Sequence, residues 1–229
     1  MAGGLRVVVW ILIIALVSGC AASAPGQPET TASPPTADPT SIWHATVVVQ
    51  NGSSHGSGVI IGTNAVLTAY HVVDDGRSVV EFLGAEQVPG SISWVDDRLD
   101  LAILRVAVPS GYRPAHLYCG PLKPDDKLVS IGHPLLQRWV STEGHLGTAV
   151  VDSDPFLQAL DFELSLGSSG GPVFDREARV VGISTAILAV VQTPATATLR
   201  QKAGDGPQTG IGLMVPSSRF CDQVLQQMP

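Results

Sequence analysis

Short runs of apolar, mostly β-branched residues alternate with turn signals along the chain from Trp43 onward. They read WHATVVVQ, GVIIG, AVLTAY, SVVEFLG, LDLAILRVAV, KLVSIG, GHLGTAVV, RVVGISTAILAVV and TGIGLMVP. Val, Ile and Thr favour strands, whereas the intervening Gly, Asn, Asp and Pro favour turns. Helices between the strands, which a doubly wound α/β fold requires, are missing from the pattern. It therefore predicts an all-β, antiparallel barrel or sandwich.

A helical pattern occurs at the C-terminal end. Phe220, Val224 and Met228 recur at four-residue spacing, with Cys221 and Leu225 alongside. Residues 217–228 are therefore predicted to form a helix, capped by Ser217, that docks through this apolar stripe. Residues 192–209, rich in Ala, Thr, Gly and Gln, are predicted to form a surface loop.

The N-terminal segment differs from the rest of the chain. Residues 1–19 contain one basic residue, an apolar run too short to span a bilayer comfortably, and then small residues, which predicts a signal peptide. Residues 20–41 are rich in Ala, Pro, Ser and Thr and predict a flexible tether. The sequence LVSGC resembles the bacterial lipobox, which implies cleavage before Cys20 and a lipid on its thiol. An ordinary secretory signal with an incidental cysteine is the alternative.

Composition narrows the choice of partners and cofactors. The 229-residue chain has 13 Lys and Arg, no basic run and a formal charge of −7, so we expect no nucleic-acid binding. No spacing of Cys and His suggests a metal site, and we expect neither metal nor cofactor. Beyond Cys20, the remaining Cys119 and Cys221 are either a disulfide or two buried free thiols.

Three residues could supply nucleophilic catalysis, which needs a nucleophile, a base and a group that orients the base. His71 lies at the end of the apolar run AVLTAYHVV, and Asp100 directly precedes the buried-looking strand LAIL. A carboxylate there is costly unless something pairs with it. Ser169 lies in Gly-Ser-Ser-Gly-Gly-Pro, residues 167–172. If this segment is a tight turn, the N–H groups of Gly167 and Ser169 could converge to form an oxyanion hole.

The motifs TAYHVV, LDLAIL and GSSGGPVF occur in the order of the His, Asp and Ser motifs of trypsin-like serine proteases, which they resemble. GSGVII, KLVSIGHP and IGLMVPSS are similar to the bacterial Deg/HtrA branch. The resemblance covers nearly all of residues 42–229. It implies two antiparallel, six-stranded Greek-key β-barrels, at about 42–116 and 117–216, followed by the C-terminal helix. It also implies a serine endopeptidase of protein or peptide substrates, with His71, Asp100 and Ser169 in the cleft between the barrels.

Several positions depart from the family pattern. Ser168 stands where the family usually has Asn or Asp, and no Ile-Val-Gly-Gly start follows the tether, so activation by N-terminal cleavage is not expected. Tyr70 replaces a smaller residue before the histidine, which would narrow one side of the cleft. Because the sequence ends after the predicted helix, we expect no PDZ domain.

The resemblance also implies a pocket for the substrate side chain before the scissile bond. Its walls would come from residues 183–185 and 211–213, with Ser184, Thr185 and Gly212 contacting substrate. Glu163, six positions before Ser169, would lie near the base of the pocket. An acid there would favour a basic substrate side chain, unless the carboxylate faces solvent instead.

Two other functions fit parts of the sequence. Residues 167–171 also match the G-x-S-x-G pattern of α/β-hydrolases, in which the serine opens a helix and the catalytic histidine comes later in the chain. No helix start and no histidine follow Ser169, which excludes an α/β-hydrolase. The second alternative is a membrane-tethered binding module that keeps the protease fold but is inactive or activated by a partner. The predicted whole is an exported serine endopeptidase anchored by lipid to a bacterial membrane. Its oligomeric state stays open.

Overall fold

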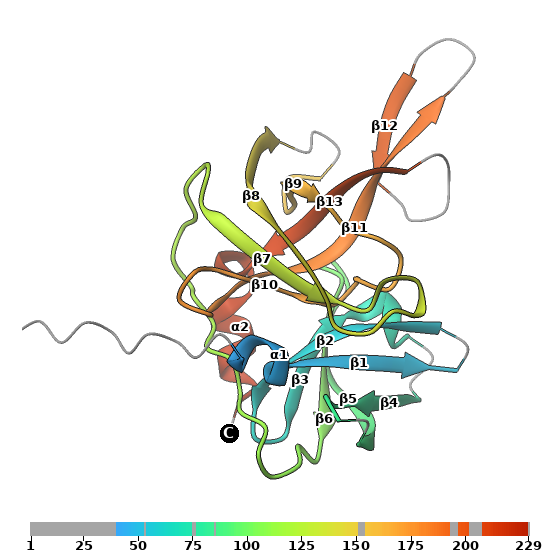
Figure 1. Ribbon diagram of the computed structural model, residues 1–229, viewed down its shortest axis with the longest axis vertical. Helices are drawn as coiled ribbons and strands as arrows, with labels where there is room; N and C mark the ends of the chain where they lie inside the picture. Colours follow the sequence, from blue (N-terminus) through green and yellow to red (C-terminus); the bar gives the residue numbers. More distant parts are fainter. Residues whose placement is uncertain are drawn as a thin grey trace, which may run out of the picture. The chain divides into compact units, whose positions relative to one another are not determined.

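The computed structural model describes residues 40–52, 54–74, 77–84, 86–150, 154–192, 197–201 and 208–228 (Figure 1). The predicted signal peptide, Cys20 and all but the end of the predicted tether lie outside these ranges. Within them, no helix combines the length and the apolar character that crossing a membrane requires.

The first half of the described chain forms a closed antiparallel barrel with the strand order β1-β2-β3-β6-β5-β4 (Figure 1). Its strands are β1 (Thr46–Asn51), β2 (Ser54–Gly62), β3 (Ala65–Ala69), β4 (Ser78–Glu81), β5 (Gln87–Asp96) and β6 (Leu101–Val106). The short helix α1 (Ser41–Ala45) precedes β1, and the 3₁₀ turn η1 (Tyr70–Val72) follows β3.

The second half forms a sheet with the order β10-β7-β8-β9-β13-β11-β12, which closes into a six-stranded barrel because β10 also pairs with β11. β12 extends this barrel as the partner of β11. The strands are β7 (Lys127–Gly132), β8 (Val140–Val150), β9 (Gln158–Glu163), β10 (Pro172–Phe174), β11 (Val180–Gln192), β12 (Ala197–Gln201) and β13 (Gln208–Pro216). The predicted fold class, two six-stranded antiparallel barrels, is confirmed.

The near-continuous apolar runs seen in the sequence arise because some strands are covered on both faces. All five residues of β3 are buried. Side chains alternate between the two faces of a strand, so Val66 points into the core of the first barrel while Leu67 joins a second core. β5, by contrast, alternates exposed and half-buried residues, as expected for a strand that packs on one face.

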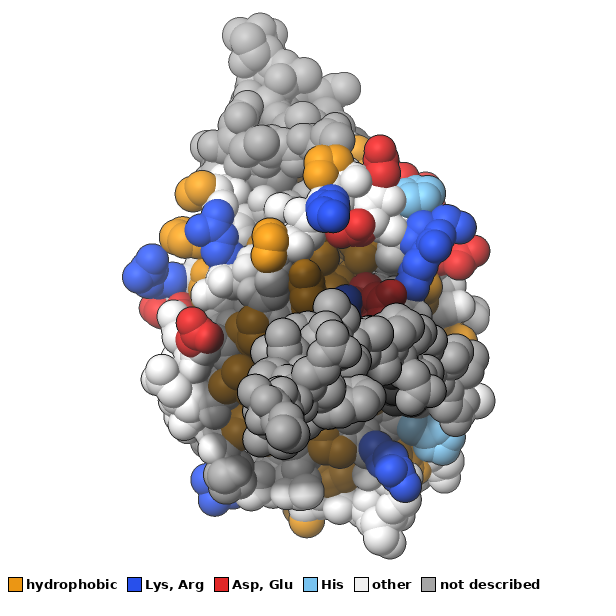
Figure 2. Space-filling model, turned by 90° about the vertical axis from the view of Figure 1, so that its left-hand side faces the viewer, with side chains coloured by type: hydrophobic (Ala, Val, Ile, Leu, Met, Phe, Trp, Pro, Cys, Tyr) orange, Lys and Arg blue, Asp and Glu red, His pale blue; other side chains and the backbone are white. Residues whose placement is uncertain are grey.

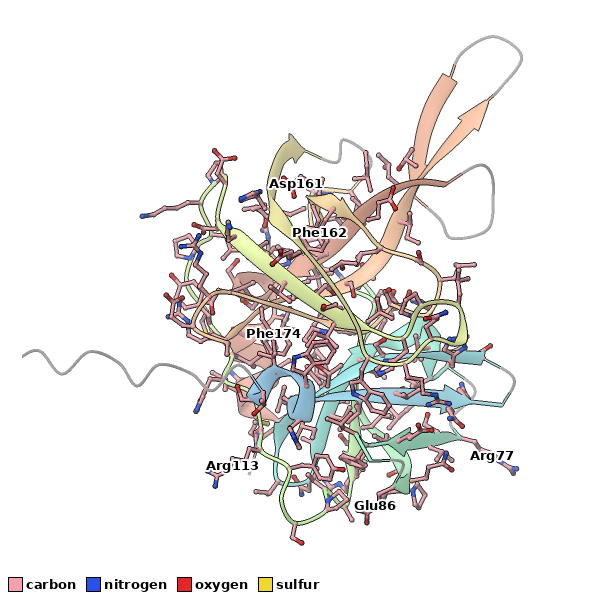
Figure 3. All side chains as sticks on the ribbon, in the orientation of Figure 1. Arg77, Glu86, Arg113, Asp161, Phe162 and Phe174 are labelled. Atoms are coloured by element: carbon pink, nitrogen blue, oxygen red, sulfur yellow. A yellow bond between two sulfur atoms is a disulfide. The ribbon has the colours of Figure 1, made fainter. Side chains whose placement is uncertain are left out.

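The core between the barrels joins them into one packed unit. It combines Val59, Leu67 and Leu101 of the first barrel with residues of the second, including Phe174 and Ile183. Phe174, labelled in Figure 3, is completely buried. Each large apolar side chain that is fully buried between the barrels contributes about 1.5–3 kcal/mol to the stability of the fold. This packing brings the loops of both barrels together where the candidate site lies.

The C-terminal helix is shorter than predicted. Residues 217–219 form the 3₁₀ turn η3 (Ser217–Arg219), and α2 covers only Cys221–Gln226. Ser217 does not cap it, because its hydroxyl donates a hydrogen bond to the carbonyl of Tyr118. The predicted apolar stripe is confirmed at Phe220 and Val224, both completely buried, whereas Leu225 is exposed.

Cys119 and Cys221 form a disulfide, with Cα atoms 5.5 Å apart. It links the segment between the barrels to α2. Because the two cysteines are 102 residues apart in the sequence, the bond restricts the unfolded chain over a long loop. Such a bond typically stabilises a fold by about 2–4 kcal/mol.

The prediction of a surface loop over residues 192–209 is wrong for part of that segment. Strand β12 lies within it and pairs with β11 from Leu188↔Gln201 to Gln192↔Ala197, and β13 begins at Gln208. The stretch ATLRQ has no strand pattern of its own, and the Pro and Gly residues on either side of it favour a loop. Residues 193–196 and 202–207 lie outside the described ranges.

Candidate active site

His71 and Asp100, 29 residues apart in the sequence, are in direct contact. The ring Nδ1 of His71 lies 2.5 Å from Asp100 Oδ2, and the His71 main-chain N–H donates to Oδ1 at 2.9 Å. With one carboxylate oxygen on the ring and the other on the backbone, the imidazole is held in one orientation. The two side chains are 45% and 35% exposed, so Nε2, at the far end of the ring, is open to a reacting group.

The turn before β6 aims the carboxylate at the histidine. Asp100 has a positive φ of 54°, a strained conformation for a residue other than glycine, although Asp tolerates it better than most. The Asp96 carboxylate shapes this turn by accepting the N–H groups of Arg98 and Leu99. The Asp100 carbonyl also accepts the N–H of Tyr70, at 2.9 Å, so main chain and side chain of Asp100 both hold the segment that carries His71.

Ser169 comes from the second barrel and lies against the segment that carries His71. Its carbonyl accepts the N–H of Ser57 at 2.8 Å. A Cβ on Gly56 would lie 2.8 Å from that carbonyl and 2.7 Å from Val72 Cγ2, and a Cβ on Gly170 would lie 2.7 Å from the main-chain N of Ala69. The Ser169 turn therefore packs against the end of β3, two residues before His71.

Four consecutive carbonyls of this turn accept hydrogen bonds. The Leu166 carbonyl accepts the N–H of Leu135 at 2.9 Å, and the Gly167 carbonyl accepts the Ser57 hydroxyl at 2.7 Å. The Ser168 carbonyl accepts both the Ser184 hydroxyl, at 2.7 Å, and the Gly171 N–H, at 2.9 Å. Ser169 is the fourth, through its contact with the Ser57 N–H.

These contacts orient the N–H groups of the turn. In a planar trans peptide the N–H points away from the carbonyl of the preceding residue. Fixing the carbonyls of Leu166 and Ser168 therefore fixes the directions of the Gly167 and Ser169 N–H groups. Neither N–H donates to any residue that the structure describes, which leaves both available to an incoming oxygen.

Glycine is required at two positions of the turn. Gly167 has φ +98° and Gly170 has φ +81°, both disfavoured for side chains. A Cβ on Gly167 would lie 2.4 Å from the His133 carbonyl, and one on Gly170 would lie 2.2 Å from the Ser57 carbonyl. The glycine-rich sequence thus permits both the backbone conformation and the close approach of the two barrels.

Sequence reasoning missed two residues beneath the turn. Ser57 is completely buried, and its hydroxyl lies 3.0 Å from Nδ1 of His133 and accepts the His133 main-chain N–H at 3.1 Å. The His133 carbonyl in turn lies 3.1 Å from Nε2 of His55. The sequence GSGVII contains Ser57 and KLVSIGHP contains His133, but nothing in either segment indicates that they meet.

The residues predicted to bind substrate occupy different environments. Ser184 is buried, and its hydroxyl donates to the carbonyls of Ser168 and Gly171. Thr185, also buried, follows it on β11. A Cβ on Gly212 would lie 2.6 Å from Leu164 Cγ, so Leu164 occupies the space beside that glycine. Glu163 is exposed, with its carboxyl group alongside Gly210.

A second His–Asp pair is present on the second barrel. The main-chain N–H of His145 donates to Asp161 Oδ1 at 2.5 Å, and its ring Nδ1 lies 3.1 Å from Oδ2. The main-chain hydrogen bond from His145 holds the pKa of Asp161 below its ordinary value. The residue opposite His145 on β7 is Lys127, not a serine-bearing turn. This pair therefore repeats the contacts of His71 and Asp100, with a lysine as its cross-strand neighbour on β7.

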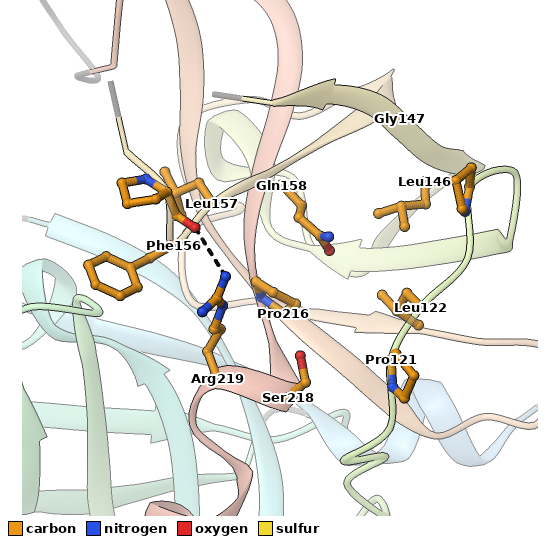
Figure 4. Close-up of a pocket in the computed structure, with 12 residues that line it drawn as sticks. Pro121, Leu122, Leu146, Gly147, Phe156, Leu157, Gln158, Pro216, Ser218 and Arg219 are labelled. Carbon is orange, nitrogen blue, oxygen red and sulfur yellow. Dashed lines mark hydrogen bonds between the residues drawn. The ribbon is translucent and has the colours of Figure 1, made fainter. Parts of the chain in front are cut away.

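A cavity of about 540 Å³ lies elsewhere on the second barrel (Figure 4). Pro121, Leu122, Phe156 and Arg219 are among its lining residues, and Arg219 donates to the Pro155 carbonyl at 3.4 Å. It contains none of the candidate catalytic residues. We therefore assign the site by its chemistry rather than by cavity size.

Neither the charges on the face of Figure 2 nor the metal-ligating side chains of the described residues indicate a second site. On the face shown in Figure 2, acidic and basic side chains are interspersed rather than gathered into a patch of one sign. Among the described residues, no group of three or more His, Cys, Asp or Glu side chains is arranged to hold a metal ion.

The chain is similar to known proteins. Residues 56–183 match the family described as trypsin-like peptidase domain. The chain is 27% identical over 182 residues to a protein of Chlamydia pneumoniae named probable periplasmic serine endoprotease DegP-like, an alignment covering 75% of this chain and 34% of the relative. A protein of the same name from Bartonella henselae is 30% identical over 185 residues, covering 76% and 33%. The chain thus spans about a third of the length of these relatives.

Solved structures share the fold. The serine endoprotease from Yersinia pestis superposes with a TM-score of 0.64 and 22% identity, over 81% of this chain and 63% of that one. The inactive form of the Rv3671c protease gives a TM-score of 0.63 and 19% identity, over 83% and 96%. At these identities the similarity concerns the fold alone.

The buried His133 makes stability depend on pH. Desolvation, followed by the nearby charges of Arg138 and His55, lowers its pKa from 6.5 to about 3. Between these values the unfolded chain binds a proton that the folded protein excludes. The contribution of His133 to stability is therefore fully present above pH 6.5 and declines as the pH falls toward 3.

We expect wild type to lose about 2–3 kcal/mol more unfolding free energy than His133→Asn between pH 7.5 and 4.5. Urea unfolding at both pH values measures the difference. Leu128→Ala, at a buried residue of the same barrel that does not titrate, serves as control and should keep the wild-type dependence on pH. Equal losses in wild type and His133→Asn would contradict a neutral, buried His133.

Proposed function

Because this chain belongs to the family of trypsin-like peptidase domains, we propose that it is a serine endopeptidase that cleaves protein or peptide substrates. The observation that carries the proposal is that the Ser169 turn lies against the segment that carries His71, a histidine whose imidazole is oriented by Asp100. A serine nucleophile, a base and a group that orients the base are the three parts that such catalysis requires.

In the proposed mechanism, Ser169 Oγ attacks the scissile carbonyl carbon and transfers its proton to Nε2 of His71. Asp100 keeps the proton on Nδ1 and stabilises the imidazolium that forms. The N–H groups of Gly167 and Ser169 donate to the oxyanion. His71 then protonates the leaving amine. In the second half, His71 takes a proton from water, which attacks the acyl-enzyme, and returns that proton to Ser169 Oγ.

One observation favours the alternative, an inactive or partner-activated binding module. The Ser169 hydroxyl makes no hydrogen bond to any described residue, His71 included. Catalytic hydrogen bonds are often long without substrate, so this geometry is compatible with an active enzyme as well. Reactivity of the hydroxyl distinguishes the two.

The protein is also proposed to be exported, since the relatives named above are periplasmic. We propose further that a lipid on Cys20 anchors it to a bacterial membrane, since the sequence before that cysteine resembles a lipobox. Metabolic labelling with palmitate should tag wild type and fail to tag Cys20→Ser. Equal labelling of both would refute lipidation at this residue.

We expect a fluorophosphonate to label Ser169 stoichiometrically, because the probe reacts with an activated serine and needs no knowledge of the substrate. His71→Ala should lose the label, and turnover of any peptide substrate should fall by about three to six orders of magnitude. Peptide mapping locates the label, and circular dichroism shows whether each variant is folded. A folded wild-type protein that takes no label would favour the binding module.

We propose that Glu163, with Ser184, Thr185 and Gly212, borders the pocket for the side chain before the scissile bond. If the carboxylate lies at the pocket base, Glu163→Gln should lower kcat/KM for Arg and Lys substrates about tenfold relative to Ala substrates. Glu86→Gln, an exposed acid on the first barrel, is the control (Figure 3). No preference for basic residues in wild type would mean that the carboxylate faces solvent.

A further inference from the structure

Ser57 of β2 bonds to both residues of the proposed oxyanion hole. Its main-chain N–H donates to the Ser169 carbonyl at 2.8 Å, and its hydroxyl donates to the Gly167 carbonyl at 2.7 Å. Ser57 is completely buried and belongs to the first barrel, whereas the turn belongs to the second. A single residue therefore connects the two barrels where the backbone would bind the oxyanion.

Counting protons identifies the tautomer of His133. A serine hydroxyl has one hydrogen to donate, and the Gly167 carbonyl, which can only accept, takes it. Nδ1 of His133, 3.0 Å from the same oxygen, must then be the donor in that contact. The His133 main-chain N–H donates to this oxygen as well. Ser57 Oγ thus receives two hydrogen bonds and gives one.

The remainder of the His133 ring agrees with this assignment. With the proton on Nδ1, Nε2 carries none, and it is buried without a hydrogen-bond partner among the described residues. An unpaired acceptor is tolerated in a protein interior more often than an unpaired N–H donor. Trp139 packs against the ring edge at 5.0 Å between centroids, and His55 contacts the His133 carbonyl. The imidazole is therefore held as a neutral donor to Ser57.

Gly167 needs such support because its own backbone has little preference. Glycine can adopt several backbone conformations of similar energy, and the one at φ +98° is only one of them. Local sequence alone would therefore not select one peptide orientation. Rotation of a neighbouring peptide plane would turn the Gly167 N–H away from the substrate. The Leu166 carbonyl, in the same peptide plane as that N–H, accepts from the Leu135 N–H, and the Ser57 hydroxyl holds the Gly167 carbonyl in the plane that follows. With the peptide planes on both sides held, Gly167 cannot relax to another conformation.

We propose that Ser57 and His133 are positioning residues: the His133 Nδ1–H orients the Ser57 hydroxyl, and that hydroxyl holds the peptide plane that follows Gly167, so that the glycine keeps the conformation in which its N–H faces the oxyanion. This inference rests on the proposed peptidase function. Neither Ser57 nor His133 contacts substrate in this proposal. Its effect appears in the transition state, when negative charge develops on the substrate oxygen.

Steady-state kinetics of the full-length protein on a cleaved peptide tests the proposal. Removing an oxyanion donor typically costs about 10²–10³ in kcat, and loosening one should cost less. We expect Ser57→Ala and His133→Leu to lower kcat by about 10- to 100-fold, with KM within about twofold of wild type. His133→Asn should recover most of kcat, because its amide N–H can replace Nδ1–H.

The matched control is Ser78→Ala. Ser78 is also a buried serine of the first barrel, but its hydroxyl has no hydrogen-bond partner among the described residues. Its removal should leave kcat unchanged. A general loss of stability would affect both serine variants and would not be rescued by His133→Asn.

Nitrogen-15 NMR of the His133 ring gives a second readout that does not need a folded variant. We expect a protonated Nδ1 and an unprotonated Nε2 in wild type. A proton on Nε2, or a folded Ser57→Ala with wild-type kcat, or a change confined to KM, would overturn the proposal. If wild type neither cleaves peptides nor reacts with fluorophosphonate, the peptidase function itself fails and the positioning role fails with it.

Discussion

The Ser169 turn lies outside the sheet ladders, and its conformation depends on hydrogen bonds to the carbonyls of residues 166–169. Donors to these carbonyls come from both barrels: Ser57 from the first, and Leu135 and Ser184 from the second. Any change in how the barrels pack would displace some donors relative to others. The apolar core between the barrels therefore contributes to the geometry of the candidate site as well as to stability.

Hydrogen bonds also fix the backbone on the histidine side of the site. The Asp100 carboxylate accepts from the His71 main-chain N–H and contacts the His71 ring, and the Asp100 carbonyl accepts the N–H of Tyr70. Asp100 itself has a strained, positive φ. Such strain persists only where surrounding contacts over-determine the conformation. The pair His145 and Asp161 shows that the contact alone does not make a site. The two barrels supply a His–Asp pair each, but in the described structure the Ser169 turn lies against the segment that carries the first pair's histidine.

Buried polar groups connect these two parts of the molecule. Ser57, His133 and Ser184 are all buried. The hydroxyls of Ser57 and Ser184 donate to carbonyls of the Ser169 turn, and the ring Nδ1 of His133 contacts the Ser57 hydroxyl. Burying polar groups is costly unless they are hydrogen-bonded, so this network has few alternative arrangements of similar energy. A small set of hydrogen bonds thus determines a backbone geometry that local propensity leaves open.

The sequence by itself determined the all-β class and the order of the three motifs, because strand periodicity and glycine-rich turns are local patterns. It did not determine where the C-terminal helix begins, since the hydroxyl of Ser217 bonds to Tyr118, far away in the sequence. Nor did it predict β12, which exists through pairing with β11. The contact between Ser57 and His133 joins positions 76 residues apart, and only the packing of one barrel on the other brings them together.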